Sequence, residues 1–315
     1  MGVLGKIMEN IGGFLSNAPT NWGRWGKEDE IGALNFLGNA EVLRGISTIK
    51  DGSVFTLGQL IRDPEGDLLG TERRPTGYHM LLDEIGNSGG VDYADDLMYI
   101  YTHGTTHIDA LGHVWYDDQS YNGHEKPTGT GGLPRNGIHL AAKKGIVGRA
   151  VLLDVARYKG VDWIREGAEI TLEDLLNTAA HQNVTLNKHD ILLVRTGFYL
   201  NFVKNGYHAY FQNGLKEPGI TYTDELVRWF YDQEIPVYGT DTLGSEQTVS
   251  SQTGTVFPLH PYFLTRLGLS IVETLWLEEL ASACAQDGRY DFCLMISPLK
   301  LVGGTASPIN PIAIR

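Results

Sequence analysis

The chain has 315 residues, 42% of them hydrophobic and 20% charged, which is sufficient for one large globular domain. Its formal net charge of −13 argues against nucleic acid as a partner, because phosphate binding needs a basic surface. The same charge disfavours binding to anionic membranes.

Cysteine usage and hydropathy limit the class of protein further. Cys284 and Cys293 follow no C-x-x-C pattern, so the sequence indicates neither a zinc knuckle nor a disulfide framework. It holds no run of eighteen or more apolar residues, which argues against a transmembrane helix. Glu9 interrupts the N-terminal stretch too early for a secretory signal. We therefore expect a cytoplasmic protein with reduced thiols.

The N-terminal region divides into an arm and the start of a domain. Residues 1–19 carry no strong pattern, and we expect an arm or short helix before a single domain spanning residues 20–315. Trp22 and Trp25 then alternate with glycine and arginine. Such a cluster is as consistent with core packing beneath a loop as with a pocket wall that stacks on a flat substrate.

A helix over residues 41–50 and a strand over 53–58 come next. Residues 62–96 mix Pro, Gly, Asp and Arg with little periodicity, which predicts a long loop with a strand or two inside it. Long loops in compact domains tend to be functional, so a substrate lid is one interpretation. The apolar run 97–101 predicts a buried strand.

A group of metal-binding residue types follows that run, with His103, His107, Asp109 and His113 close together. In a regular strand, His103 and His107 would lie roughly 13 Å apart, too far to share one ion. On a helix, Asp109 would point away from His107. The sequence therefore predicts a bend at residues 104–106, after which extended chain directs His107 and Asp109 to one side.

Two imidazoles and a carboxylate suit Zn²⁺, Mn²⁺ or Fe²⁺ and leave positions open for water and substrate, which favours catalysis. His113 lies four residues beyond Asp109. We expect it beside the metal as a proton acceptor rather than as a ligand. Any one of these residues, taken alone, is as consistent with a hydrogen-bonded structural role.

Beyond His113 the chain has an aromatic and polar stretch in which Trp115 and Tyr116 suit either a pocket rim or the core. The glycine-rich stretch 129–132 lacks the Gly-Lys-Ser/Thr ending of a phosphate loop, which favours a turn. From residue 148 an α/β pattern begins. We predict buried strands at 149–154, 190–197 and 235–241, and helices at 171–180 and 223–233 with threonine N-caps.

Polar residues at strand ends invite functional interpretations. Arg195 and Asp241 stand at such ends, where α/β sites gather, although a structural ion pair is equally consistent. His260 and Glu273 each sit within apolar sequence, where an unpaired polar group is costly. Taken alone, each favours a structural role.

The spacing His-x3-His-x-Asp-x3-His resembles the signature of the cyclase family of metal-dependent hydrolases, which includes bacterial kynurenine formamidases and isatin hydrolases. That pattern usually reads His-x-Gly-Thr-His-x-Asp-x-Pro-x-His. Here residues 104–106 read Gly-Thr-Thr and Leu111 replaces the proline. The opening at 21–26 and the ending at 297–308 also resemble the family, so the likeness covers roughly residues 20–315.

The resemblance implies an α/β fold like a swivelling β/β/α domain, with a mixed sheet that curls towards a barrel and helices outside. It implies that His260 and Glu273 hold a second ion, about 4 Å from the ion of His103, His107 and Asp109, or, with a single ion, orient water and substrate by hydrogen bonds. It also implies a homo-oligomer, either a dimer or a tetramer.

These expectations combine into a Zn²⁺- or Mn²⁺-dependent hydrolase, with one or two ions, that opens an amide, cyclic amide, formamide or lactone bond in a small, flat or aromatic molecule. Two alternatives stay open. An iron-dependent oxygenase uses the same set of two histidines and a carboxylate, and a non-catalytic binding protein would hold the metal for stability alone.

Overall fold

The computed structural model describes residues 13, 15, 17–63, 67, 74–82 and 90–315. Among them, nine strands form one mixed sheet in the order β1-β13-β11-β5-β7-β9-β10-β4-β12. In that order the strands span Val54–Thr56, Ile312–Ile314, Asp291–Ile296, Ile146–Asp154, Ile191–Arg195, Val237–Thr240, Ser270–Glu273, His107–Asp109 and Ala306–Pro308. The sheet curls towards a half-barrel, which confirms the predicted fold class.

Four neighbouring strands, β5, β7, β9 and β10, are mutually parallel, and the strands on both sides of them are antiparallel. Alternate residues of these strands enter two separate cores. In β5, Val151 and Leu153 join one core while Ala150 and Leu152 join the other. Burial on both faces explains why these strands read as continuous apolar runs.

Helices cover both faces of the sheet. Helices α6 (Leu172–His181) and α8 (Asp224–Gln233) pack into one core, while α4 (Ile138–Lys144) and α9 (Glu278–Asp287) pack into the other. The predicted threonine caps are present, because Thr171 and Thr223 accept hydrogen bonds from the third residue of each helix. The remaining elements are η2 (Gly32–Phe36), α3 (Asn39–Ile46), η3 (Tyr121–Gly123), α5 (Val155–Tyr158), α7 (Phe198–Tyr210), η4 (Pro261–Leu267) and a parallel pair, β6 (Glu169–Ile170) with β8 (Gly219–Ile220).

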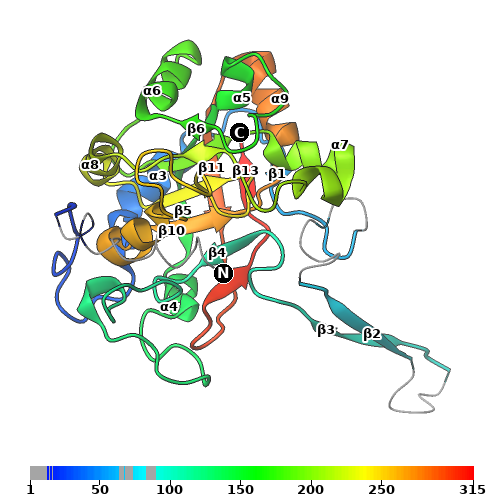
Figure 1. Cartoon of the computed structure of the whole chain (residues 1–315). Helices are drawn as coiled ribbons and strands as arrows, with labels where there is room; N and C mark the ends of the chain where they lie inside the picture. The colour runs from blue at the N-terminus through cyan, green and yellow to red at the C-terminus, as the bar shows by residue number, and fades with distance from the viewer. Residues whose placement is uncertain (1–12, 14, 16, 64–66, 68–73, 83–89) are drawn as a thin grey trace.

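The prediction of a buried strand at 97–101 was wrong about burial. Residues 97–99 are the end of β3 (Ala94–Tyr99), and residues 100–101 follow it. This strand pairs only with β2 (Gly77–Leu82) among the described strands. The hairpin projects from the body, and every residue of β3 is exposed (Figure 1). Leu97 is 54% exposed and Tyr99 is 68% exposed. The apolar run lacks a covering layer because neither face of this hairpin meets the main sheet.

Several smaller expectations have clear outcomes. Of the predicted loop 62–96, residues 64–66, 68–73 and 83–89 lie outside the described residues. The described part of that loop contains β2 and the start of β3. In the predicted arm, Leu15 is fully buried in a core. Cys284 and Cys293 are free and buried. None of the described helices combines the length and the apolar character needed to cross a bilayer.

Arg195 and Asp241 belong to separate hydrogen-bond sets. The guanidinium of Arg195 donates to Glu278 and Asp154, whereas Asp241 accepts from the main chain and hydroxyl of Thr196. Both residues therefore tie strand ends to their neighbours, and these contacts support a structural role.

Candidate metal centre

Strand β4 supplies the centre of the site. His107 and Asp109 are two residues apart in an extended segment, so they project to the same side, while Ile108 between them enters the opposite core. Strand β10 runs antiparallel beside β4 and places Glu273 directly opposite His107. Cross-strand partners lie about 5 Å apart at Cβ. This register brings His107 Nε2 to 3.1 Å from Glu273 Oε2.

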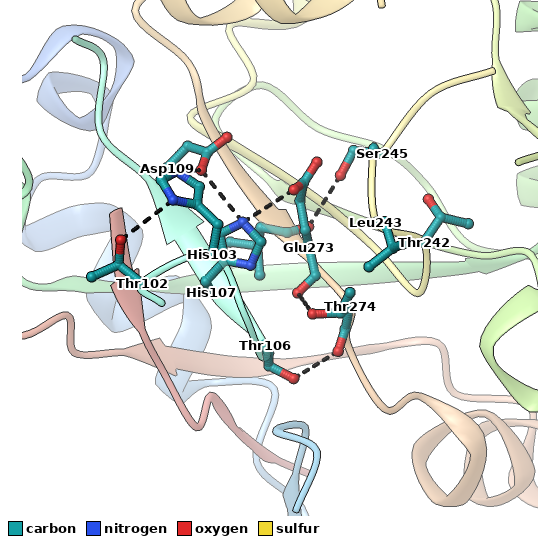
Figure 2. Close-up of polar contacts among 12 residues, drawn as sticks. Thr102, His103, Thr106, His107, Asp109, Thr242, Leu243, Ser245, Glu273 and Thr274 are labelled. Atoms are coloured by element: carbon teal, nitrogen blue, oxygen red, sulfur yellow. Dashed lines mark hydrogen bonds and ion pairs between the residues drawn. The ribbon is translucent and has the colours of Figure 1, made fainter. Parts of the chain in front are cut away.

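The bend predicted between His103 and His107 is present. Residues 102–106 form turns and bends, and the main-chain nitrogen of Gly104 donates to the carbonyl of Tyr101 at 2.8 Å. A Cβ at position 104 would stand 2.9 Å from that carbonyl oxygen, so this close approach requires glycine. The bend folds His103 back until its Nε2 lies 3.3 Å from Asp109 Oδ1 (Figure 2).

His113 returns to the same place after the turn that follows β4. Its ring centroid lies 4.2 Å from that of His103. One potential ligand atom from each of His103, Asp109 and His113 falls within 4.8 Å of the others, and the same holds for His107, Asp109 and Glu273. Asp109 is therefore shared by two groups of donors, and His113 is positioned where a ligand or an adjacent base would stand.

His260 approaches Glu273 from the other side. It precedes η4, and its Nε2 lies 3.2 Å from Glu273 Oε1. Glu273 thus stands between two histidines, with His107 facing its other oxygen. The fold brings all five residues predicted as metal ligands, and His113, to one place. The elements that carry them come from parts of the sequence that are far apart.

Three of the histidines have a polar contact at Nδ1, and that of His103 is with the hydroxyl of Thr102 at 3.3 Å. His107 Nδ1 lies 2.7 Å from the main-chain oxygen of Thr105, and His260 Nδ1 lies 2.7 Å from a carboxylate oxygen of Glu246. Each contact leaves Nε2 facing the centre, which is how ligating histidines are usually held. Thr105 departs from the family pattern, but its contact with His107 does not depend on the side chain, because the acceptor is the main-chain oxygen.

The residues present fit a divalent metal. His103 Nε2, His107 Nε2, both oxygens of Asp109 and Glu273 Oε1 are buried, and none has a well-directed hydrogen bond to any residue that the structure describes. The contacts of these nitrogen and oxygen atoms with one another are ion-pair contacts rather than well-directed hydrogen bonds. Buried polar atoms are almost always satisfied, and imidazole with carboxylate is a donor set for divalent transition metals. A cation at this point would satisfy all of them.

The electrostatics of these side chains agree with this interpretation. Burial alone would raise the pKa of Asp109, but His113, His103 and His107 hold it well below its usual value. Burial would lower the pKa of His107, but Glu273 and Asp109 raise it. Burial lowers the pKa of His113 to about 4, so its imidazole is neutral at pH 7.

Sequence reasoning missed two features of the site. Glu246, only 1% exposed, lies in a short polar stretch with no periodic signal and is found only through its contact with His260. Thr274, directly after Glu273, has a φ of 55° and donates its hydroxyl to the carbonyl of Glu273 (Figure 2). A positive φ is unusual for a β-branched residue, and it ends β10 at Glu273.

The aromatic residues considered as pocket walls divide into two kinds. Trp22 donates its indole N–H to the carbonyl of Thr265, and Trp25 packs edge-on against Phe36 at 4.9 Å. Both pack against a hydrophobic core, as does Tyr116, which supports the packing interpretation. Trp115 is 43% exposed.

Together, the curled mixed sheet and the shared donor groups define an α/β protein with a candidate divalent-metal centre. A family model described as "Putative cyclase" matches residues 48–247. A solved structure of a novel cyclase is 33% identical, covers 94% of this chain and 99% of its own, and superposes with a TM-score of 0.83. The chain belongs to the cyclase family.

More distant structures share the fold. Isatin hydrolase A from Ralstonia solanacearum is 19% identical with a TM-score of 0.61, covering 86% of this chain and 94% of its own. Isatin hydrolase A from Labrenzia aggregata is 18% identical with a TM-score of 0.59, covering 83% and 93% respectively. No curated protein matches the chain.

Proposed function

We propose that this protein is a metal-dependent hydrolase that opens an amide, cyclic amide, formamide or lactone bond. The observation that carries the proposal is the position of Asp109, which lies within ligand-sharing distance of His103 and His113 and also of His107 and Glu273. Membership of the cyclase family and likeness to isatin hydrolases support the same reaction class.

Each side chain of the centre has a role in this proposal. His103, His107 and Asp109 would hold one divalent ion, and His260 with Glu273 would hold a second that also reaches Asp109. When bound, such ions polarise a carbonyl oxygen and lower the pKa of a coordinated water towards neutrality. Zn²⁺ and Mn²⁺ both suit these donors.

His113 is the proposed proton carrier. Because burial lowers the pKa of His113 to about 4, the ring is neutral at pH 7 and accepts a proton from the attacking water. It would then pass that proton to the leaving nitrogen or oxygen. Its ring centroid lies 4.2 Å from that of His103, one of the proposed ligands, which supports a place beside the ion.

The test is hydrolysis of a panel of formamides, cyclic amides and lactones by protein whose metal content is measured first. We expect turnover that disappears with a chelator and returns with Zn²⁺ or Mn²⁺, also without oxygen. Anaerobic turnover excludes the oxygenase, and absence of turnover across the panel with metal bound favours the binding protein. Retained metal with lost activity in His113→Ala supports the base, whereas loss of one ion makes His113 a ligand.

The same proposal includes a homo-oligomer and a small, flat or aromatic substrate; the cytoplasmic location stays a prediction. The β2–β3 hairpin supports self-association, because an isolated two-stranded hairpin is marginally stable in water and this one exposes Met80, Leu82, Leu97 and Tyr99. Every copy carries the hairpin, so a two-fold interface would pair it with itself. Leu97→Asp should lower the mass measured by light scattering, and an unchanged mass argues against this interface.

A further inference from the structure

Glu246 makes a set of contacts that the proposed reaction does not use. Its Oε1 accepts the main-chain N–H of His260 at 2.8 Å and lies 2.7 Å from Nδ1 of the same residue, while its Oε2 accepts the main-chain N–H of Leu259 at 2.7 Å. Three donors therefore converge on two carboxylate oxygens. An ionised carboxylate is an acceptor only, so Nδ1 of His260 must carry a proton.

The other ring nitrogen of His260 faces an acceptor. Nε2 lies 3.2 Å from Glu273 Oε1, a buried oxygen without a well-directed hydrogen bond to any described residue. In the neutral ring with a proton on Nδ1, Nε2 presents a lone pair to this oxygen. Two acceptors held this close call for a positive charge between or beside them, which a second proton on the ring supplies in the metal-free protein and a bound cation would supply in its place.

Packing fixes Glu246 in place. It is 1% exposed, and its main chain forms an isolated parallel bridge with Ile220 of β8. The neighbouring Gly219 lies so close that an added Cβ would stand 2.4 Å from the carbonyl carbon of Glu246. The carboxylate therefore reaches His260 from a rigid support, not from a mobile side chain on the surface.

We propose that Glu246 is a positioning residue that selects the tautomer of His260, so that Nε2 is available to the second cation of the centre. The inference rests on the proposed function for one element only, which is the second cation. A cap for the start of η4 would explain the two main-chain bonds, but it would not require the third contact, to the imidazole.

The test is a titration of metal-depleted full-length protein with Co²⁺, followed by visible absorption. We expect two ions in the wild type. In Glu246→Gln the amide group lets His260 place its proton on Nε2, so the second ion should bind about 10- to 100-fold more weakly while the first is retained. Glu217→Gln is the matched control, because Glu217 is equally buried, at 0% exposure, but bonds to Tyr210, Leu243 and Gly244.

A double-mutant cycle separates the roles of capping and positioning. In a His260→Ala background, Glu246→Gln should weaken the second ion no further. An equal additional loss there, or wild-type affinity in Glu246→Gln alone, overturns the proposal. The proposal is also overturned if the wild type binds one ion only and Glu246→Gln leaves the affinity for that ion unchanged.

The tautomer is also measurable without any variant. In metal-loaded wild-type protein labelled with ¹⁵N-histidine, we expect the His260 proton on Nδ1, and a proton on Nε2 refutes the inference even if Glu246→Gln does not fold. These readouts are independent of turnover. A wild type without hydrolase activity that shows this pattern contradicts the proposed function alone, whereas an active hydrolase with the proton on Nε2 contradicts the inference alone.

Discussion

Asp109 should control both ions, because it is the one residue that the proposed ligand sets of the two ions share, and it belongs to both groups of converging donors. Replacing it with asparagine keeps the size of the side chain but removes the charge that His103 and His107 face at 3.3 and 3.5 Å. We expect Asp109→Asn to lose both ions. His103→Ala removes a donor from one group only and should lose one.

The size of the effect follows from the length of the chain. An ion present at 100 times its Kd stabilises the folded state by about 2.7 kcal/mol. An unfolding entropy of about 2.1 cal/mol/K per residue, over 315 residues, means that about 0.7 kcal/mol shifts Tm by one degree. Each ion should therefore raise Tm by about 4 °C, and two ions by about 8 °C.

The assay compares Tm with and without Zn²⁺ or Mn²⁺ for each variant, so that changes in the metal-free protein cancel. The metal-induced rise should be about 8 °C in the wild type, about 4 °C in His103→Ala and close to zero in Asp109→Asn. A full rise in Asp109→Asn would refute the shared-ligand reasoning. Equal rises in the two variants would show that Asp109 serves a single ion.

Two further predictions concern the protons and the packing around the centre. Although burial would lower the pKa values of His107 and His260, Glu273 raises the first, and Glu246 with Glu273 raises the second. Below these raised pKa values, the metal-free protein therefore holds protons on His107 and His260. Because a metal must displace these protons, metal affinity should increase with pH and binding should release protons. Calorimetry in two buffers of different protonation enthalpy checks this, and equal heats would contradict it. In β9, a Cβ at Gly239 would stand 2.8 Å from Leu193 Cδ2 and 3.0 Å from Leu275 Cδ1, so Gly239→Ala should cost about 1–3 kcal/mol in urea unfolding. Gly254→Ala has no atom in the way and tests the strain of a positive φ alone.

The local part of the site followed from the sequence. The spacing of His103, His107 and Asp109 fits neither a regular strand nor a helix, so a bend was required, and the structure has one at residues 102–106. The α/β pattern after residue 148 was equally strong, because strands buried on both faces and helices with threonine caps have distinct signals.

The distant part of the site did not follow from spacing. Glu273 faces His107 through the register of β4 and β10, and a register between strands more than 160 residues apart leaves no mark in either segment. Only the family resemblance placed His260 and Glu273 there. The prediction that residues 97–101 are buried was wrong for a related reason, because an apolar run does not indicate which layer of the protein covers it.

The pairing of β4 with β10 also bears on the order of events during folding. His103, His107 and Asp109 are neighbours in the unfolded chain, whereas Glu273 joins them only when the sheet has closed over a long loop. Metal ions added to the denatured chain would meet an incomplete set of donors. High affinity for metal should therefore appear late in refolding, as a report that the two halves of the sheet have met.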